Sequence, residues 1–329
     1  MKIRPYTGIA PVCIHLWEDS VMKLLYILFL CLSLLLSGCG KDCDHQFVHT
    51  SSKEPSCVLP GILEETCTLC KTLRETVIPE TGHSFALYSA EPCVCTRCGE
   101  YVEGAAADPS HPWYGKTWLA LGTSLTSPEF GRYVEPLAER SGLIPSNLGI
   151  PGACAHDLIL HLARTSGDLK KAHLITVEFG VNDWNQNIPL GTPGDTVPYL
   201  YQTEDWHNDG SPRGTYAGSC YQVFHALLEN APGARIVFLT DPAGTWEESL
   251  RTDKNKLGLT QRQYAETAMA AAQLMGIPVI DAGGTAQIGQ EHPEYYTDHI
   301  HHTDLGGRQY ALTVWMELKD IAPLLTGVG

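Results

Sequence analysis

Residues 117–318 alternate between short apolar runs and longer amphipathic stretches, and this alternation limits the fold of the chain more than any other feature of its sequence. We predict strands at the apolar runs, which are 117–121, a short run that reaches Leu148, 174–179, 235–239 and 277–280. We predict helices at 130–140, 155–163, 216–228, 261–275 and 305–318. Strands that alternate with helices form a parallel sheet covered on both faces. The sequence therefore predicts a three-layer α/β/α domain with a doubly wound parallel sheet, over residues 104–329.

Small and polar residues follow the predicted strands, at the edge where such sheets bind their ligands. Ser124 lies in the turn after the first strand, Gly152 follows the second, and Asn182 follows the third. Asp298 and His301 lie on the loop before the last helix. Each has an ordinary structural role on its own, such as capping a helix or a turn. Together they supply what acyl transfer needs: a nucleophile, a general base and a carboxylate that orients the base.

The blocks that carry these residues resemble those of the SGNH (GDSL-like) serine hydrolase family. They are a Gly-x-Ser that ends at Ser124, a glycine at Gly152, a Gly-Val-Asn-Asp that contains Asn182, and an Asp-x-x-His that ends at His301. The similarity spans residues 117–318. It implies a flavodoxin-like sheet and an esterase that works through an acyl-enzyme and needs no cofactor.

The resemblance also implies a role for each residue. Ser124 would be the nucleophile, His301 the base and Asp298 the carboxylate that orients it. The N–H groups of Ser124 and Gly152 and the side chain of Asn182 would form the oxyanion hole. One position departs from the family, because its usual Gly-Asp-Ser is Gly-Thr-Ser here, and the Asp that helps to brace the loop is replaced by Thr123.

Two features near the site have competing interpretations. His299, His301 and His302 together suggest a metal site, but their loop lacks a preceding H-E-x-x-H helix, and the Asp-x-x-His spacing favours His301 as a base. The insertion 185–215 is rich in Gly, Pro, Asp and aromatic residues, which suits stacking on sugar rings, although a plain surface loop fits its length equally well. Its neighbourhood holds the aromatic residues Trp184, Tyr199, Tyr201 and Trp206.

The first 39 residues have the pattern of a leader segment. The apolar run 24–36 has the length of a signal-peptide core, follows Lys23, and ends in a Leu-Ser-Gly-Cys sequence at Cys39. This sequence resembles a bacterial lipobox, which implies that Cys39 is lipidated and tethers the protein to the outer face of the membrane. Met22 then reads as the natural start, and residues 1–21 as an upstream extension. A buried apolar helix is the alternative interpretation of the run. We assign residues 1–39 to the extension and leader.

The segment 40–103 is rich in cysteine. Of the twelve cysteines of the chain, seven lie between Cys43 and Cys98. Cys67 and Cys70 form one C-x-x-C pair and Cys95 and Cys98 another, and four such ligands suit a structural zinc ion. Cys43, His45, Cys57, His83 and Cys93 are spare ligands, which leaves a different set of four ligands, or a second metal, as an alternative. A disulfide framework is the alternative, although an odd number of cysteines leaves one over. We predict a small zinc-ribbon-like module.

The net charge and the predicted surface location favour some classes of function over others. The formal net charge of −15 argues against nucleic acid as a partner. With a surface tether, the sequence predicts a serine esterase that removes acetyl or other small acyl groups from a glycan or a small ester. A lipid or lysophospholipid esterase is one alternative, and a surface binding protein that keeps the fold without catalysis is another.

Overall fold

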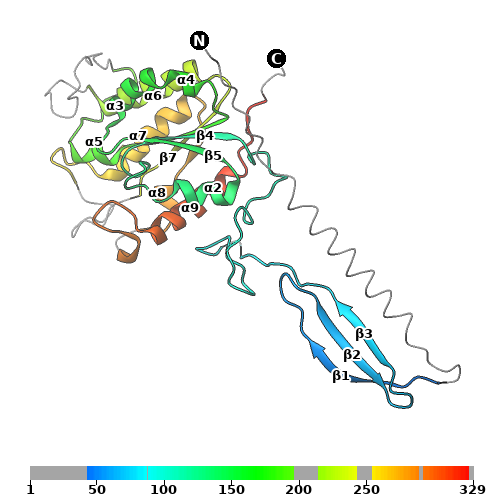
Figure 1. The fold of residues 1–329 in the computed structure, drawn as a ribbon. Coiled ribbons are helices and arrows are strands. Elements are labelled where there is room, and N and C mark those ends of the chain that lie inside the picture. The colour runs from blue at the N-terminus through cyan, green and yellow to red at the C-terminus, as the bar shows by residue number, and fades with distance from the viewer. Residues whose placement is uncertain (1–42, 87, 196–213, 243–253, 289–291, 326–329) are drawn as a thin grey trace, which may run out of the picture. The chain divides into compact units, whose positions relative to one another are not determined.

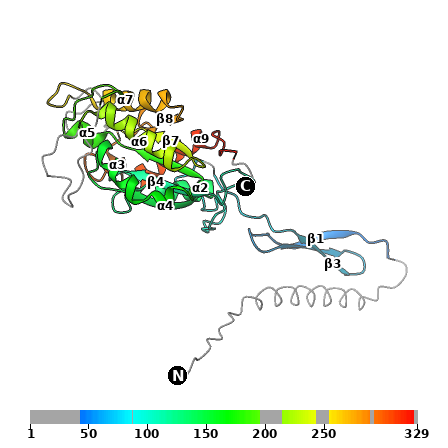
Figure 2. The ribbon, with the colours of Figure 1, turned by 90° about the horizontal axis from the view of Figure 1, so that it is seen from above.

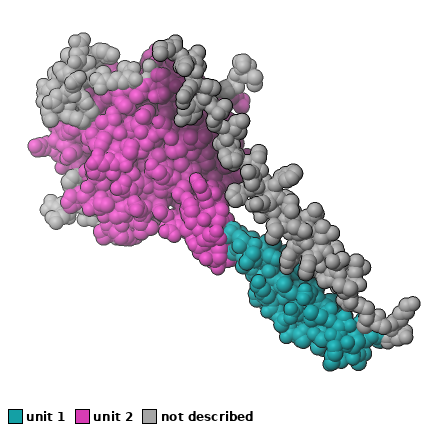
Figure 3. Space-filling view, viewed as in Figure 1, with its two compact units in different colours: residues 1–83 teal, residues 84–329 magenta. Residues whose placement is uncertain are grey.

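The structure, a computed structural model, describes residues 43–86, 88–195, 214–242, 254–288 and 292–325. The chain divides into two compact units, residues 1–83 and 84–329, which we call the N-terminal and C-terminal units (Figure 3). The sequence predicts that residues 84–103 belong to the cysteine-rich module. In the structure they belong to the C-terminal unit, where Arg140 donates a hydrogen bond to the Ser89 carbonyl and Arg308 donates one to the Ala90 carbonyl.

The described part of the N-terminal unit is a three-stranded antiparallel sheet in the order β1-β2-β3 (Figure 1). Its strands are β1 (Phe47–Lys53), β2 (Gly61–Cys67) and β3 (Leu73–Ile78). The register pairs Phe47 with Cys67 and is interrupted between His49 and Ser51. The segment that precedes β1 therefore lies beside the turn between β2 and β3.

The C-terminal unit is built on five parallel strands in the order β5-β4-β6-β7-β8. They are β4 (Thr117–Gly122), β5 (Ile144–Gly149), β6 (Leu174–Glu178), β7 (Arg235–Leu239) and β8 (Val279–Ile280). Numbered along the chain, the five strands run 2-1-3-4-5, which confirms the predicted doubly wound sheet. In this topology the chain reverses direction across the sheet at β4 and β6, and the crevice beyond their C-terminal ends is the usual ligand site.

Helices cover both faces of this sheet. The long ones are α2 (Val134–Ser141), α3 (Ala155–Arg164), α6 (Tyr216–Asn230), α7 (Gln261–Leu274) and α9 (Asp304–Leu318). The connections hold α4 (Ser166–Leu169), α5 (Val181–Asn185), α8 (Ala282–Thr285) and the 3-10 turn η1 (Pro293–Tyr295). Helices α3, α6 and α7 pack on one face and α2 and α9 on the other (Figure 1). Helix α6 contacts both α3 and α7 (Figure 2).

Alternation of side chains along the strands gives the sheet two cores. Leu119 and Leu121 of β4 join the core under α3, α6 and α7. Trp118 and Ala120, one position out of phase, join the core under α2 and α9. Both faces are therefore sealed by apolar side chains, and the polar residues at the strand ends are the part of the sheet that is left to bind a ligand.

Helix α2 begins four residues later than the sequence predicts. Residues 130–133 instead fold back on the turn after β4, where Gly131 N–H donates to the Ser127 carbonyl at 2.8 Å and Phe130 N–H donates to Ser127 Oγ at 3.3 Å. Gly131 approaches the backbone of Leu125 and Thr126 so closely that a Cβ there would lie 2.5 Å from an oxygen. Local helical pattern is overridden here by contacts with the serine turn.

No helix among the described residues is both long and apolar enough to cross a bilayer. The leader 1–39 and Cys39 lie outside the described residues, and so do Tyr199, Tyr201 and Trp206.

Candidate active site

The turn that follows β4 places Ser124 at the C-terminal edge of the sheet. Ser124 is 7% exposed. The turn is closed by Ser127, whose N–H donates to the Thr123 carbonyl at 3.0 Å and whose hydroxyl donates to the Ser124 carbonyl at 3.1 Å. The serine backbone is therefore fixed before a substrate arrives, as electrostatic catalysis requires.

Glu178, the last residue of β6, lies under this turn. Its Oε1 accepts a hydrogen bond from the Thr123 N–H at 2.6 Å, and the hydroxyls of Thr123 and Thr126 donate to the same oxygen at 2.9 Å. A Cβ at Gly122 would lie 2.4 Å from that oxygen, so a side chain there would displace the Glu178 carboxylate. The missing Asp at Thr123 is thus offset by a carboxylate from the neighbouring strand, which the sequence analysis did not identify.

A second buried acid stands beside Glu178. Asp241, after β7, accepts a hydrogen bond from Val181 N–H at 2.8 Å and is 9% exposed. Burial, followed by the negative charge of Glu178, holds the pKa of Asp241 well above its usual value. A protonated Asp241 can donate to the Glu178 carboxylate, which lets both acids stay buried together.

The loops after β5 and β6 are tied to one another. Gly152 has a φ of 77°, in the left-handed region that favours glycine. Asn182 Nδ2 donates to the Ala153 carbonyl at 2.9 Å, and both oxygens of Asp183 accept from Ala155 N–H at 3.1 Å. A side-chain amide has two N–H groups, and this hydrogen bond uses one of those of Asn182 and positions its side chain.

The loop after β5 also packs directly on the serine turn. Ile150 N–H donates to the Gly122 carbonyl at 2.9 Å, and Asn147 Nδ2 donates to the Thr126 carbonyl at 2.6 Å. A Cβ at Gly149 would lie 2.4 Å from the Ser127 nitrogen. Three of the predicted blocks are therefore connected through the backbone of this edge.

The fourth block forms an ion-pair geometry of its own. His301 Nδ1 lies 2.7 Å from Asp298 Oδ2, and Asp298 Oδ1 accepts from the N–H groups of Ile300 and His301. Partial burial opposes ionisation of Asp298, but these hydrogen bonds outweigh it and hold the pKa of Asp298 below its usual value. With Nδ1 engaged by Asp298, Nε2 of His301 is the nitrogen left to take a proton.

Phe130 links His301 to residues 124–130, which we call the serine segment. Its ring stacks on the His301 ring, with centroids 4.8 Å apart and an interplanar angle of 29°. Phe130 is held to the serine turn through Ser127, as described above. The structure therefore brings the Asp-x-x-His loop to the segment that carries Ser124.

His302 has a different environment from its neighbour. It is 3% exposed and packs against the rings of Tyr296 and Tyr310. Burial, together with the nearby His301, lowers the pKa of His302 to about 4, so it is a neutral core side chain near pH 7. Among the described residues, no group of three or more Cys, His, Asp and Glu side chains that lie close enough to share an ion includes His299, His301 or His302.

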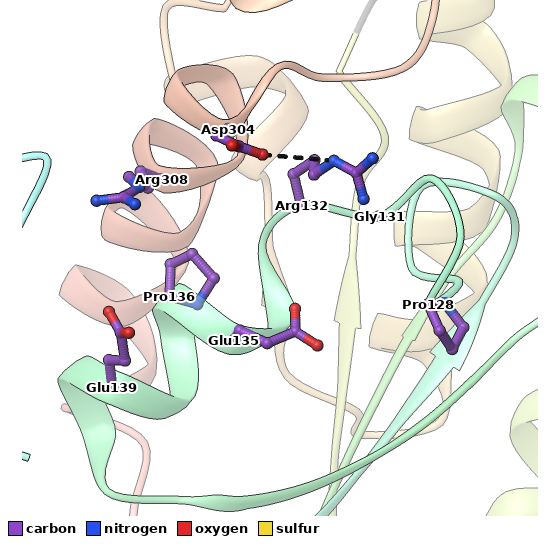
Figure 4. Close-up of a pocket in the computed structure, with 8 residues that line it drawn as sticks. All are labelled: Pro128, Gly131, Arg132, Glu135, Pro136, Glu139, Asp304 and Arg308. Atoms are coloured by element: carbon purple, nitrogen blue, oxygen red, sulfur yellow. Dashed lines mark ion pairs between the residues drawn. The ribbon is translucent and has the colours of Figure 1, made fainter. Parts of the chain in front are cut away.

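A pocket of about 320 Å³ adjoins this segment (Figure 4). The loop after the serine turn forms one wall and helices α2 and α9 form the others. Its lining is highly charged, and Arg132 forms an ion pair with Asp304 at 3.5 Å. The lining residues are Pro128, Gly131, Arg132, Glu135, Pro136, Glu139, Asp304 and Arg308.

Two predicted binding features look different in the structure. Trp184, expected beside a sugar-stacking loop, is 9% exposed and its indole N–H donates to the Leu259 carbonyl, so it serves the core. Cys67 and Cys70, expected to share a metal with Cys95 and Cys98, instead lie with Cys43 and His45. Hairpin register brings these ligands together, and C-x-x-C spacing alone could not reveal it.

One solved structure, 23% identical, covers 64% of this chain and 99% of its own with a TM-score of 0.50, which supports the fold. A protein from Lactobacillus plantarum is 20% identical, covering 62% and 97% with a TM-score of 0.49. A lipase/acylhydrolase from Enterococcus faecalis is 14% identical, covering 64% and 100% with a TM-score of 0.44. No curated protein matches the chain.

The model of the GDSL-like lipase/acylhydrolase family matches residues 117–309, which is more than half of the chain. This match confirms the resemblance carried by the four sequence blocks. The chain belongs to the GDSL-like lipase/acylhydrolase family.

Proposed function

We propose that this protein is a serine esterase at the cell surface that removes acetyl or other small acyl groups from a glycan. The observation that carries the serine chemistry is the pairing of His301 with Asp298 on a loop whose histidine ring stacks on Phe130 of the serine segment. Membership of an acylhydrolase family supplies the reaction class, cleavage of an ester.

In the proposed mechanism, Ser124 Oγ attacks the ester carbonyl while His301 Nε2 takes its proton. Asp298 keeps the imidazole in the tautomer that leaves Nε2 basic and stabilises the imidazolium that forms. The N–H groups of Ser124 and Gly152 and the second N–H of Asn182 stabilise the tetrahedral oxyanion. The leaving alcohol receives the proton from His301, and water then hydrolyses the acyl-enzyme by the same steps in reverse order.

No cofactor takes part in these steps. The Cys/His groups of the N-terminal unit could bind a metal, and we assign that metal a structural role apart from catalysis.

A polar substrate is supported by the charged pocket that adjoins the serine segment, although Ser124, Asn182 and His301 do not line this pocket. Its charged lining, from Arg132, Asp304 and Arg308 among others, suits hydroxyl and carboxylate groups better than a long acyl chain. An esterase for lipids needs an apolar groove next to the nucleophile, so a lysophospholipid is the second candidate.

The surface location rests on the leader. Its apolar run and the Leu-Ser-Gly-Cys sequence at Cys39 resemble those of exported lipoproteins and support this part of the proposal. Labelling of cells with a radioactive fatty acid, compared between the natural chain and Cys39→Ala, tests the anchor: label that persists in the variant contradicts it.

The function is tested with the full chain and p-nitrophenyl esters of increasing acyl length, in parallel with Ser124→Ala. We expect turnover that is fastest for acetate and falls as the chain lengthens, and none above background in the variant. Release of acetate from acetylated xylan and of fatty acid from a lysophospholipid then separates the two substrate classes. Equal rates in both proteins would overturn the serine assignment and favour a binding protein.

A further inference from the structure

The sheet of the N-terminal unit has almost no apolar core. Among the described residues of this unit, only Cys57, Gly61 and Cys67 are buried. Its larger apolar side chains are exposed, with Leu69 at 60%, Val77 at 56% and Leu73 at 53%. A small sheet without a hydrophobic face is not stable in water on its own, and proteins of this kind hold themselves together with metals or disulfides.

Three thiols and one imidazole converge at one end of this sheet. Cys43 and His45 precede β1, Cys67 ends β2, and Cys70 lies in the turn that leads to β3. One ligand atom from each of the four lies within 4.8 Å of the others. The register that pairs Phe47 with Cys67 produces this convergence, because it sets the start of β1 against the β2–β3 turn.

The distances fit a tetrahedral zinc ion. Zn–S bonds of about 2.3 Å at tetrahedral angles put two sulfurs about 3.8 Å apart, and a Zn–N bond of about 2.0 Å puts nitrogen and sulfur about 3.5 Å apart. Cys43 Sγ and Cys67 Sγ are 3.8 Å apart, and His45 Nδ1 and Cys70 Sγ are 3.3 Å apart. A disulfide would use two of these four groups and leave the other two with no shared role.

The C-x-x-C turn itself is shaped to present its sulfurs. Lys71 N–H donates to the Cys67 carbonyl and Cys67 N–H donates to the Thr72 carbonyl. The backbone of Lys71 has a φ of 66°, which residues other than glycine rarely adopt. In the C-terminal unit, the turn at Cys95 is closed by the same two hydrogen bonds, with Gly99 at a φ of 74°. Two unrelated stretches that share this turn and its cysteines indicate a turn built around the sulfurs.

Neighbouring groups contact both the cysteine sulfurs and the histidine ring. Thr72 Oγ1 lies 3.0 Å from Cys70 Sγ, and Cys70 N–H donates to Cys67 Sγ at 3.5 Å, as expected for sulfurs that carry negative charge. The His45 ring stacks on Phe47 with centroids 5.3 Å apart. The guanidinium of Arg74 covers the Phe47 ring at 4.1 Å. These contacts fix the imidazole in place.

We propose that Cys43, His45, Cys67 and Cys70 bind one Zn²⁺ ion, which fastens the start of β1 to the β2–β3 turn and serves as the core of the N-terminal unit. Three soft thiolates and one imidazole in a tetrahedron are a zinc donor set. This site is independent of the proposed hydrolytic function.

The test measures zinc bound to the full chain after purification with reductant and Zn²⁺, followed by dialysis against metal-free buffer. We expect His45→Ala and Cys43→Ser each to lose one equivalent relative to the natural chain. His49→Ala, an exposed histidine on β1, is the matched control and keeps it. His45→Cys, which restores a zinc ligand, keeps it as well. The readout is a difference between variants, so zinc held elsewhere does not alter it.

Two further measurements keep the proposal falsifiable where a variant folds poorly. Co²⁺ in place of Zn²⁺ should give the absorption of a tetrahedral thiolate site in the natural chain, with one thiolate more in His45→Cys. Mass spectrometry of protein that has been isolated from its natural host without reductant detects any disulfides. Equal zinc content in His45→Ala and the natural chain, or a disulfide between any two of Cys43, Cys67 and Cys70, would overturn the proposal.

Discussion

The two units of this chain are ordered in different ways. The C-terminal unit buries large side chains such as Trp118, Tyr133 and Phe238 in two cores, and each buried side chain of this kind contributes about 1.5–3 kcal/mol. The described sheet of the N-terminal unit buries no large apolar side chain and instead gathers three thiols and an imidazole at one end. One unit is held by many weak contacts, and the other depends on a few strong bonds.

This difference places the proposed catalytic residues and the proposed metal site in different units. The residues proposed for catalysis all lie in the unit that folds on its own cores, and the proposed metal lies in the other. Changes to the catalytic residues should therefore leave metal content untouched, and removal of metal should leave ester hydrolysis largely intact.

Ser124→Ala should lower kcat/KM for p-nitrophenyl acetate by roughly 10⁴-fold or more, because no other group in the site replaces the nucleophile. Zinc content should be the same as in the natural chain. Ser146→Ala, which removes an exposed hydroxyl on β5, is the matched control and should keep the rate. A Ser124→Ala rate within tenfold of the natural chain would contradict the assignment.

Asn182→Ala should lower kcat by about a hundredfold or more, because it removes one donor of the proposed oxyanion hole. KM should change little, since the donor acts mainly in the transition state. The variant also loses the hydrogen bond to the Ala153 carbonyl, so circular dichroism must confirm an intact fold. A rise in KM with kcat unchanged would assign Asn182 to substrate binding instead.

His302 should make the C-terminal unit sensitive to acid. Its pKa is about 4 in the folded protein and about 6.5 in the unfolded chain, so only the unfolded chain takes the proton as pH falls between these values. Folding stability then decreases with falling pH, by about 2 kcal/mol at pH 5 relative to pH 7.

Urea unfolding at both pH values, in the natural chain and in His302→Phe, measures that loss. The variant should lose less stability at pH 5, whereas His49→Ala in the N-terminal unit should behave as the natural chain. Equal pH dependence in the natural chain and His302→Phe would show that His302 does not titrate as proposed.

Glu178→Gln should lower kcat/KM by about tenfold, because it weakens charged hydrogen bonds that position the serine turn through Thr123 and Thr126. Because Glu178 acts through the turn and not on the substrate, the variant should lose activity while its circular dichroism spectrum shows an intact fold. Thr123→Asp in the Glu178→Gln background returns the family's bracing acid and should restore part of the rate. If the double variant folds but recovers no activity, an acid at position 123 does not replace Glu178.

The sequence predicted the layers of the C-terminal unit well, because hydrophobic period and turn residues are local signals. The strand expected at 235–239 is β7 (Arg235–Leu239), and the helix expected from Tyr216 begins there. Positions set by distant contacts were missed. Helix α2 begins at Val134 because residues 130–133 fold onto the serine turn.

In the candidate site, too, local motifs were predicted from the sequence and distant contacts were missed. The four blocks were visible in the sequence because each is a short motif at a strand end. Glu178 was assigned only to a strand, although a carboxylate within an otherwise apolar run was a signal that it has a buried partner. The zinc ligands could not be chosen from C-x-x-C spacing, because the pairing of Phe47 with Cys67 decides which residues meet.

We propose above that Ser124 is the nucleophile and that His301 activates it. Reaction of the full chain with a fluorophosphonate, followed by digestion and mass spectrometry, tests it most directly. We expect one adduct, on the peptide that contains Ser124, with much slower labelling in His301→Ala and none in Ser124→Ala. An adduct on another residue, or ester hydrolysis that survives complete labelling of Ser124, would contradict it.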